Sequence, residues 1–238
     1  MQFSTPIVVL TLLFANQAVG RDGTTSPRIV IGFMGGMVAH DNAAHSEVQL
    51  AARLQSDYPA DVQVRLFENR RSRQANSEIL RLLDVDRDGT LSAAEKLDAR
   101  IAIYGHSWGA SEAVNLARAL GKEGIPVLLT VQVDSIAKPG ENDERIPANV
   151  AQAVNFYQRR GLLRGRRLIR ATDASRTQIL GNFQFDYKTN PVSCAGYPWY
   201  ARTFMKSHIE IESDPSVWRQ VETLIRSKLH APVPRGAE

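Results

Sequence analysis

The sequence has a single cysteine, Cys194, which excludes any disulfide within the chain. No basic or acidic partner residue stands beside this thiol in the sequence, so nothing indicates a cysteine nucleophile. The apolar run Ile7 to Ala15 is too short to span a bilayer, which takes roughly 20 residues, and no other candidate span is present. Internal repeats and low-complexity tracts are also missing, so a solenoid or a disordered chain is excluded.

What remains is typical of one globular domain: 238 residues, of which 43% are hydrophobic and 23% charged. The formal net charge is +4, yet charges of both signs are interspersed except between residues 159 and 170. We therefore predict no nucleic-acid partner. The arginine cluster has two open interpretations, a solvated loop or a surface that attracts an anionic head group.

The first 20 residues resemble a secretory signal peptide. The apolar run Ile7 to Ala15 is followed by the small residues Ala18-Val19-Gly20 and then by charged Arg21, although Met1 to Thr5 lacks Lys and Arg. We expect cleavage near Gly20 and export to the periplasm or the extracellular space. The alternative is a buried N-terminal strand.

Beyond residue 27, β-branched runs alternate with helical patterns, which predicts one α/β domain over residues 28–229. A mostly parallel sheet should carry helices on both faces. The expected strands are Arg28–Gly32, Val62–Phe67, Arg100–Tyr104, Pro126–Val133 and Arg167–Ala171. The expected helices are Ala44–Ser56, Ala75–Leu83, Ala93–Ala99, Ala110–Leu120, Ala148–Arg159 and Pro215–Lys228.

The segment Gly105-His106-Ser107-Trp108-Gly109 stands between an expected strand and an expected helix. This G-x-S-x-G pattern is typical of a nucleophile elbow, in which glycines allow a sharp turn that pushes the serine outward. Ser107 is therefore the candidate nucleophile, and the amide of Trp108 is a candidate oxyanion donor. The glycine-rich loop after the first strand predicts the second donor at Phe33.

A serine nucleophile needs an imidazole base and a carboxylate that orients the base. Of five histidines, His208 is the candidate, because it follows every expected strand in the Ser, Asp, His chain order. Asp134 directly follows the apolar strand that ends at Val133, so it should share the sheet edge of Ser107. Asp173 follows the next expected strand and stays an alternative.

The order of these motifs, GFMGG, GHSWG, VQVDS and a late histidine, resembles the α/β-hydrolase superfamily, especially its small lipase-like and esterase-like members. The resemblance covers roughly residues 28–229. It implies a Ser/Asp/His acyl hydrolase that works through an acyl-enzyme, on a reduced version of the fold without the opening antiparallel hairpin. It also implies that Phe33 provides an oxyanion amide, with Ile31 where many lipases have histidine.

Residues 84–95 match a twelve-residue EF-hand calcium loop inserted within this domain. Three carboxylates within five residues would repel one another without a cation, so we expect a structural calcium ion. Its ligands are predicted to be Asp84, Asp86, Asp88, Thr90, Ser92 and Glu95.

An aromatic, proline-punctuated stretch at 181–204 predicts either a pocket wall or packing over the sheet edge. The leading hypothesis is a secreted carboxylic ester hydrolase acting on a small ester or a lipid, with transient contact to a lipid surface. Two alternatives stay open: an inactive calcium-binding interaction protein, and an acyltransferase or thioesterase. No organic cofactor is expected.

Overall fold

The computed structural model describes residues 27–58 and 62–230 of the chain. The expected signal peptide, with its cleavage site near Gly20, lies outside the described residues, so export stays a prediction. Across the described segments, no helix combines the length and the apolar character that a membrane span requires.

A six-stranded sheet forms the centre of the protein, in the order β2-β1-β3-β4-β6-β8, and every neighbouring pair is parallel. Its strands are β1 (Arg28–Met34), β2 (Val62–Glu68), β3 (Arg100–His106), β4 (Val127–Val133), β6 (Val150–Gln158) and β8 (Gln178–Phe185). A second, two-stranded parallel sheet pairs β5 (Arg145–Ile146) with β7 (Arg170–Ala171).

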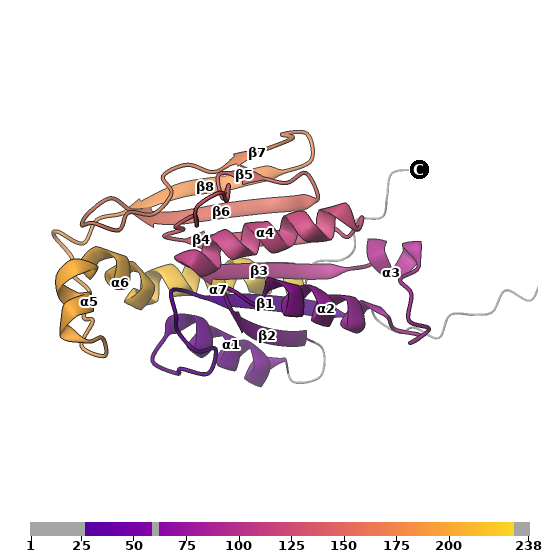
Figure 1. Ribbon diagram of the computed structural model, residues 1–238, viewed down its shortest axis with the longest axis horizontal. Coiled ribbons are helices and arrows are strands. Elements are labelled where there is room, and N and C mark those ends of the chain that lie inside the picture. Colours follow the sequence, from indigo (N-terminus) through magenta and orange to yellow (C-terminus); the bar gives the residue numbers. More distant parts are fainter. Residues whose placement is uncertain (1–26, 59–61, 231–238) are drawn as a thin grey trace, which may run out of the picture.

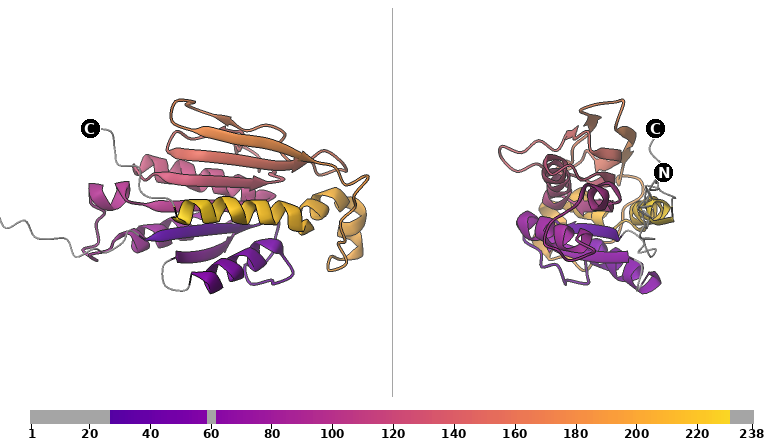
Figure 2. Two further views of the ribbon diagram at one scale, coloured as in Figure 1. Left: turned by 180° about the vertical axis from the view of Figure 1, so that it is seen from behind. Right: turned by 90° about the vertical axis from the view of Figure 1, so that its right-hand side faces the viewer.

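Helices cover both faces of the sheet, as Figures 1 and 2 show. On one face lie α2 (Ser72–Leu83) and α4 (Trp108–Lys122); on the other lie α1 (Ser46–Asp57) and α7 (Pro215–His230). Side chains alternate along the strands: Ile101 and Ile103 pack toward α4, whereas Ala102 and Tyr104 pack toward α7. The remaining helices are α3 (Ala93–Leu97), α5 (Trp199–Phe204) and α6 (Lys206–Ser213).

The predicted fold class, a mostly parallel sheet between two helical layers, is confirmed. One predicted helix is wrong: Ala148–Arg159 contains strand β6, which pairs with β4 and β8. This strand is covered on both faces, so its sequence lacks the alternation that marks a half-exposed strand. Its buried Asn155 and Gln158 side chains donate hydrogen bonds to the carbonyls of Arg166 and Leu163 in the loop that follows.

The predicted strand Arg167–Ala171 is also wrong as a member of the main sheet. Only Arg170 and Ala171 are extended, and they pair with β5. The sixth strand is instead β8, which extends into the stretch 181–204, where aromatic residues and glycine obscured the pattern. The error arose because Arg167–Ala171 is short and has only Leu168 and Ile169 as large apolar residues, and so short a run gives too little periodicity to identify a sheet strand.

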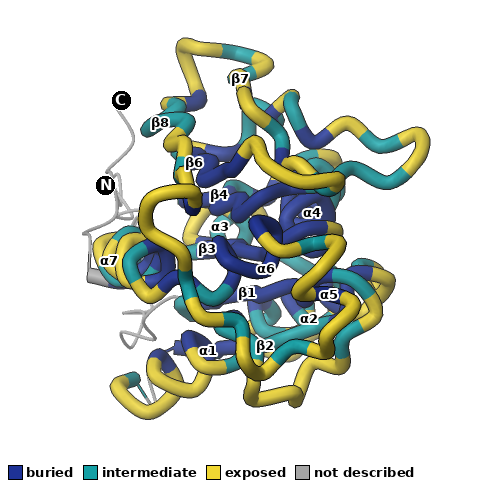
Figure 3. The backbone as a smooth tube through the Cα atoms, turned by 90° about the vertical axis from the view of Figure 1, so that its left-hand side faces the viewer, coloured by how far each residue is buried: buried dark blue, intermediate teal, exposed yellow. Residues whose placement is uncertain are grey.

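The carboxyl ends of the parallel strands all meet at one end of the molecule, which Figure 3 shows from outside. There α6 lies across the ends of β3 and β4, buried beneath more exposed segments that include α5. This is the end at which polar residues that follow β3 and β4 are expected to meet.

Candidate active site

The turn between β3 and α4 has the geometry of a nucleophile elbow. Ser107 has a φ of 55° and a ψ of −124°, a strained conformation for a residue with a side chain. A Cβ atom on Gly105 would lie 2.5 Å from the backbone of Gly109, and one on Gly109 would lie 2.3 Å from the carbonyl oxygen of Phe33. Neither position can therefore carry a side chain, because the neighbouring backbone segments approach too closely, and both glycines of the motif are required.

Ser107, His208 and Asp134 form a continuous hydrogen-bonded chain. His208 Nε2 lies 2.9 Å from Ser107 Oγ, and His208 Nδ1 lies 2.6 Å from Asp134 Oδ2. An ionised carboxylate only accepts hydrogen bonds, so Nδ1 carries the proton and Nε2 is free to accept one from the serine. The imidazole comes from α6, the short helix that precedes α7.

Asp134 is fixed by the backbone around it. The residue is fully buried and has a φ of 45°, and its amide donates to the carbonyl of Phe156. Its carboxylate accepts from the amides of Gln158 and Gly165 and from the Gln158 side chain, at 2.8 to 3.0 Å. Three donors besides His208 compensate for the burial of this charge.

Asp173 does not reach this site. Its carboxylate is bound locally by the amide and hydroxyl of Ser175, at 2.9 and 2.6 Å. The structure therefore brings together Ser107, His208 and Asp134 and leaves Asp173 in a surface turn.

Ser107 and His208 open into a pocket of about 430 Å³. Tyr197 and Tyr200 of the aromatic stretch line this pocket, whereas Phe183 and Phe185 pack against Phe156 at the sheet edge, with ring centroids 5.6 and 6.1 Å apart. Both interpretations of the stretch therefore hold, each for one half of it. Most of the remaining wall is apolar and includes Met37, Val38, Trp108, Ile136, Leu163, Ala201, Met205 and Ile209.

The two predicted oxyanion residues differ in position. Trp108 lines the pocket and is the first residue of α4, where amides have no partner within the helix. Phe33 lies inside β1, paired with Gly105, and is not part of the pocket wall. The loop reaches the pocket only at Gly35 and Gly36, and Asn69 holds it there by donating to the carbonyls of Met34 and Gly36.

Known proteins resemble this chain in fold only. No protein-family model matches the sequence, and no curated protein matches it either. Among solved structures, it is similar to a cutinase-like protein from Cryptococcus sp., with 12% identity, a TM-score of 0.44 and coverage of 85% of this chain and 95% of that chain. A thermostable esterase from Pseudomonas putida shows 12% identity, a TM-score of 0.49 and coverage of 89% and 77%. The chemistry must therefore be inferred from the residues of this chain.

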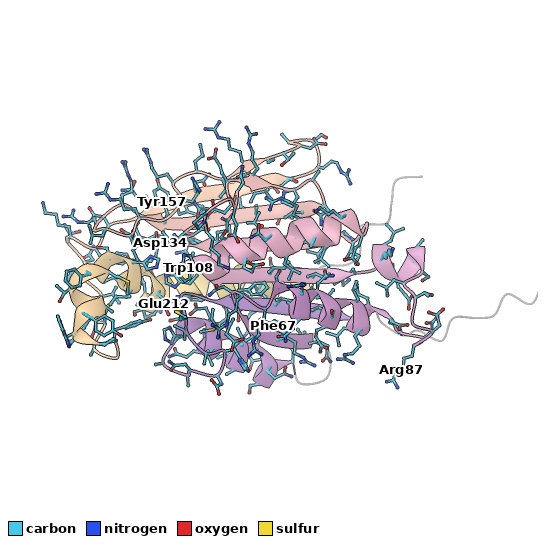
Figure 4. All side chains as sticks on the ribbon, viewed as in Figure 1. Phe67, Arg87, Trp108, Asp134, Tyr157 and Glu212 are labelled. Atoms are coloured by element: carbon cyan, nitrogen blue, oxygen red, sulfur yellow. The ribbon has the colours of Figure 1, made fainter. Side chains whose placement is uncertain are left out.

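Next to the triad lies a buried polar cluster that sequence analysis missed. Glu212 contacts His45 and lies 3.3 Å from His106 Nδ1, and the His106 ring centroid is 4.5 Å from that of His208. Figure 4 labels Glu212 near Asp134 and Trp108. Only the position of His106 within the elbow could have signalled the cluster, because Glu47 and Glu212 belong to no recognisable motif.

Burial dominates the electrostatics of this cluster. It raises the pKa of Glu47 well above its usual value, and repulsion by Glu212 adds to the rise. It would also raise the pKa of Glu212, but His106 and His45 outweigh that effect and hold this pKa below its usual range. Burial lowers the pKa of His106 to about 4, so this ring is neutral at pH 7.

The predicted calcium loop lies between α2 and α3. One carboxylate oxygen from each of Asp84, Asp86 and Asp88 lies within 4.8 Å of the others. Arg87 and Gly89 have positive φ values of 60° and 84°, which produce the sharp turn. Figure 4 shows Arg87 at the opposite end of the molecule from Trp108, because the loop precedes β3 and Ser107 follows it.

Proposed function

We propose that the protein is a serine hydrolase that cleaves carboxylic esters through an acyl-enzyme on Ser107. The observation that carries this proposal is the hydrogen-bonded chain from Ser107 through His208 to buried Asp134, at the wall of an apolar pocket. A serine, an imidazole and a carboxylate in this order are the parts that nucleophilic acyl transfer needs.

In the first half of the reaction, Ser107 Oγ attacks the ester carbonyl while His208 Nε2 accepts its proton. Asp134 stabilises the imidazolium through Nδ1. The tetrahedral oxyanion accepts hydrogen bonds from the Trp108 amide and, we propose, from the loop at Gly35 and Gly36 in place of the amide of Phe33. His208 then protonates the leaving alcohol, and a water molecule activated by the same imidazole hydrolyses the acyl-enzyme.

The pocket favours a small ester or a single acyl chain. Its volume of about 430 Å³ lies at the low end of ligand sites, and its wall is mostly apolar. Trp199, Tyr200 and Phe204 are more than half exposed in the adjacent helix α5. These aromatics supply the surface for the transient lipid contact proposed here.

An ester and thioester panel of increasing acyl length tests the proposal directly. The wild type, supplied with calcium, is expected to turn over a subset of the panel with a length limit set by the pocket. Ser107→Ala protein provides the blank for each substrate. An inactive wild type across the whole panel would contradict the proposal and favour the calcium-binding interaction protein.

Gly165→Ala should lower kcat by about 10²-fold, because a Cβ at this position would lie 2.1 Å from Asp134 Oδ1 and would displace the carboxylate. Steady-state kinetics of the variant measure this loss. Gly196→Ala is the matched control, since a Cβ there meets no atom within 4 Å. A Gly165→Ala enzyme with wild-type kcat would show that Asp134 need not stay in its observed position.

We propose that calcium binds the loop through the carboxylates of Asp84, Asp86, Asp88 and Glu95, the carbonyl of Thr90 and the side chain of Ser92, directly or through water. The ion holds α2 against α3 and stabilises the fold far from Ser107. The Glu95 carboxylate accepts from the amides of Val85 and Ser92, which directs it toward the loop.

Calcium at about 100 times its dissociation constant should raise the free energy of unfolding by roughly 2.7 kcal/mol. Thermal unfolding with and without calcium measures the shift. The Asp86→Asn/Asp88→Asn double variant should lose it, whereas Asp41→Asn, an exposed carboxylate outside the loop, should keep it. An equal calcium response in the double variant would remove the loop as the binding site.

A further inference from the structure

We propose a second metal site, for a divalent transition ion of the zinc class, formed by His45, Glu47 and Glu212 at the wall of the pocket. One donor atom from each of these side chains lies within 4.8 Å of the other two. The site is separate from the calcium loop and is independent of the hydrolytic activity proposed above.

Glu47 provides the strongest indication of a ligand. Its side chain is fully buried, and neither carboxylate oxygen makes a hydrogen bond of good geometry among the described residues; the nearest polar groups are the amides of Gly35 and Glu47 and the carboxyl group of Glu212. Buried carboxylates in proteins are almost always paired or coordinate a metal. One of the two oxygens lies 3.9 Å from His106 Nδ1, so the carboxylate is directed into the cluster that holds Glu212.

The three donors come from elements that hold them in place. His45 and Glu47 flank the first residue of α1, and the hydroxyl of buried Tyr104 donates to the Glu47 carbonyl at 3.0 Å. Glu212 comes from the last turn of α6, the helix that also carries His208. The side chain of His45 is 12% exposed and that of Glu212 is 4% exposed. Both line the pocket, which provides an entry path for an ion.

Two adjacent buried carboxylates require either a shared proton or a cation between them. An imidazole nitrogen at the same point favours the cation, because one nitrogen and two carboxylate oxygens form a donor set that zinc accepts. Ligands of a tetrahedral zinc ion lie about 3.5 Å apart. His45 Nδ1 and Glu212 Oε1 are in direct hydrogen-bond contact, so an ion between them would replace this bond and move the two donors apart by roughly 1 Å. The fourth position would face the pocket and accept water.

His106 is placed to support this site without binding the ion. Its Nδ1 atom lies 3.3 Å from the Glu212 oxygen Oε2, so a neutral ring can donate a hydrogen bond to the ligand. Such a donor next to a ligand fixes its orientation. The same ring packs against His208, which places the ion's charge one imidazole away from the triad.

Equilibrium dialysis against zinc, followed by metal analysis, tests the proposal on Ser107→Ala protein that also carries Asp86→Asn and Asp88→Asn. This background removes both turnover and the calcium loop, so failure of the ester hydrolase proposal does not affect the result. We expect one zinc ion per chain. Cobalt added to the same protein should give the visible ligand-field absorption of a four-coordinate site with one nitrogen donor.

Glu47→Gln in this background should lower zinc affinity by more than about 100-fold, because it removes a ligand rather than a supporting group. The amide can still donate to Glu212, so the variant should fold even if the pair merely shares a proton. His45→Asn is the second ligand variant and should show the same loss. Glu68→Gln is the matched control, since Glu68 pairs with His40 at 2.8 Å outside the cluster.

Zinc bound equally well by the Glu47→Gln, His45→Asn and control proteins would overturn the proposal. So would the absence of stoichiometric zinc and of a cobalt spectrum in the background protein. Either result would leave the carboxyl pair as a proton-sharing contact.

Discussion

Ser107→Ala and His208→Ala are each expected to lower kcat on the best ester substrate by on the order of 10⁶-fold. The serine loses the atom that forms the acyl-enzyme, and the histidine variant leaves that atom without a base, since Nε2 of His208 lies 2.9 Å from Ser107 Oγ. Neither change should unfold the protein, because both side chains line the pocket. Steady-state kinetics, with thermal unfolding as the check on folding, measure both losses.

The double variant tests whether Ser107 and His208 act together in one step or contribute independently to kcat. If the serine and the imidazole act as one unit, Ser107→Ala/His208→Ala should be no slower than either single variant. Ser111→Ala is the matched control: it removes a buried hydroxyl one turn further along α4, bonded to Glu141 at 2.7 Å, and should leave kcat unchanged. Losses that multiply in the double variant would contradict a shared mechanism.

Asp134→Asn is expected to lower kcat by about 10⁴-fold. The oxygen Oδ2 accepts from both His208 Nδ1 and the side-chain nitrogen of Gln158. An amide nitrogen in that position would face two donors, so the imidazole would shift its proton to Nε2 and could no longer accept from Ser107. The buried amides of Gln158 and Gly165 still find the remaining oxygen, which should keep the fold intact.

Asp173→Asn is the control for this experiment, because the sequence alone did not decide whether Asp134 or Asp173 orients the imidazole. The Asp173 carboxylate accepts hydrogen bonds from the amide and hydroxyl of Ser175, away from the triad, so the variant should keep wild-type kcat. A large loss in Asp173→Asn together with a small one in Asp134→Asn would reverse the assignment of the acid.

Much of the site was predictable because its signals are local. The elbow concentrates the nucleophile, the glycines and one oxyanion donor within five residues, and the structure gives Ser107 the strained backbone that this motif implies. The place of Asp134 followed from topology, since residues after parallel strands meet at one sheet edge. The Ser107, Asp134 and His208 side chains are indeed in contact.

The parts that sequence analysis missed depend on packing between distant segments. Strand β6 is buried on both faces, so its periodicity gave no indication of extended structure. The contact between Glu47 and Glu212 joins the start of α1 to the end of α6, and neither glutamate belongs to a motif. The sequence prediction ended the first strand at Gly32 and so began the following loop two residues too early. The strand extends through Phe33 to Met34, and the chain turns only at Gly35.

Covalent labelling with a fluorophosphonate probe, mapped by peptide mass spectrometry, tests the central claim most directly. We expect one labelled residue, Ser107, with labelling abolished in Ser107→Ala and strongly slowed in His208→Ala. Labelling that persists in Ser107→Ala, or a wild-type protein that remains unlabelled while folded and loaded with calcium, would contradict that claim.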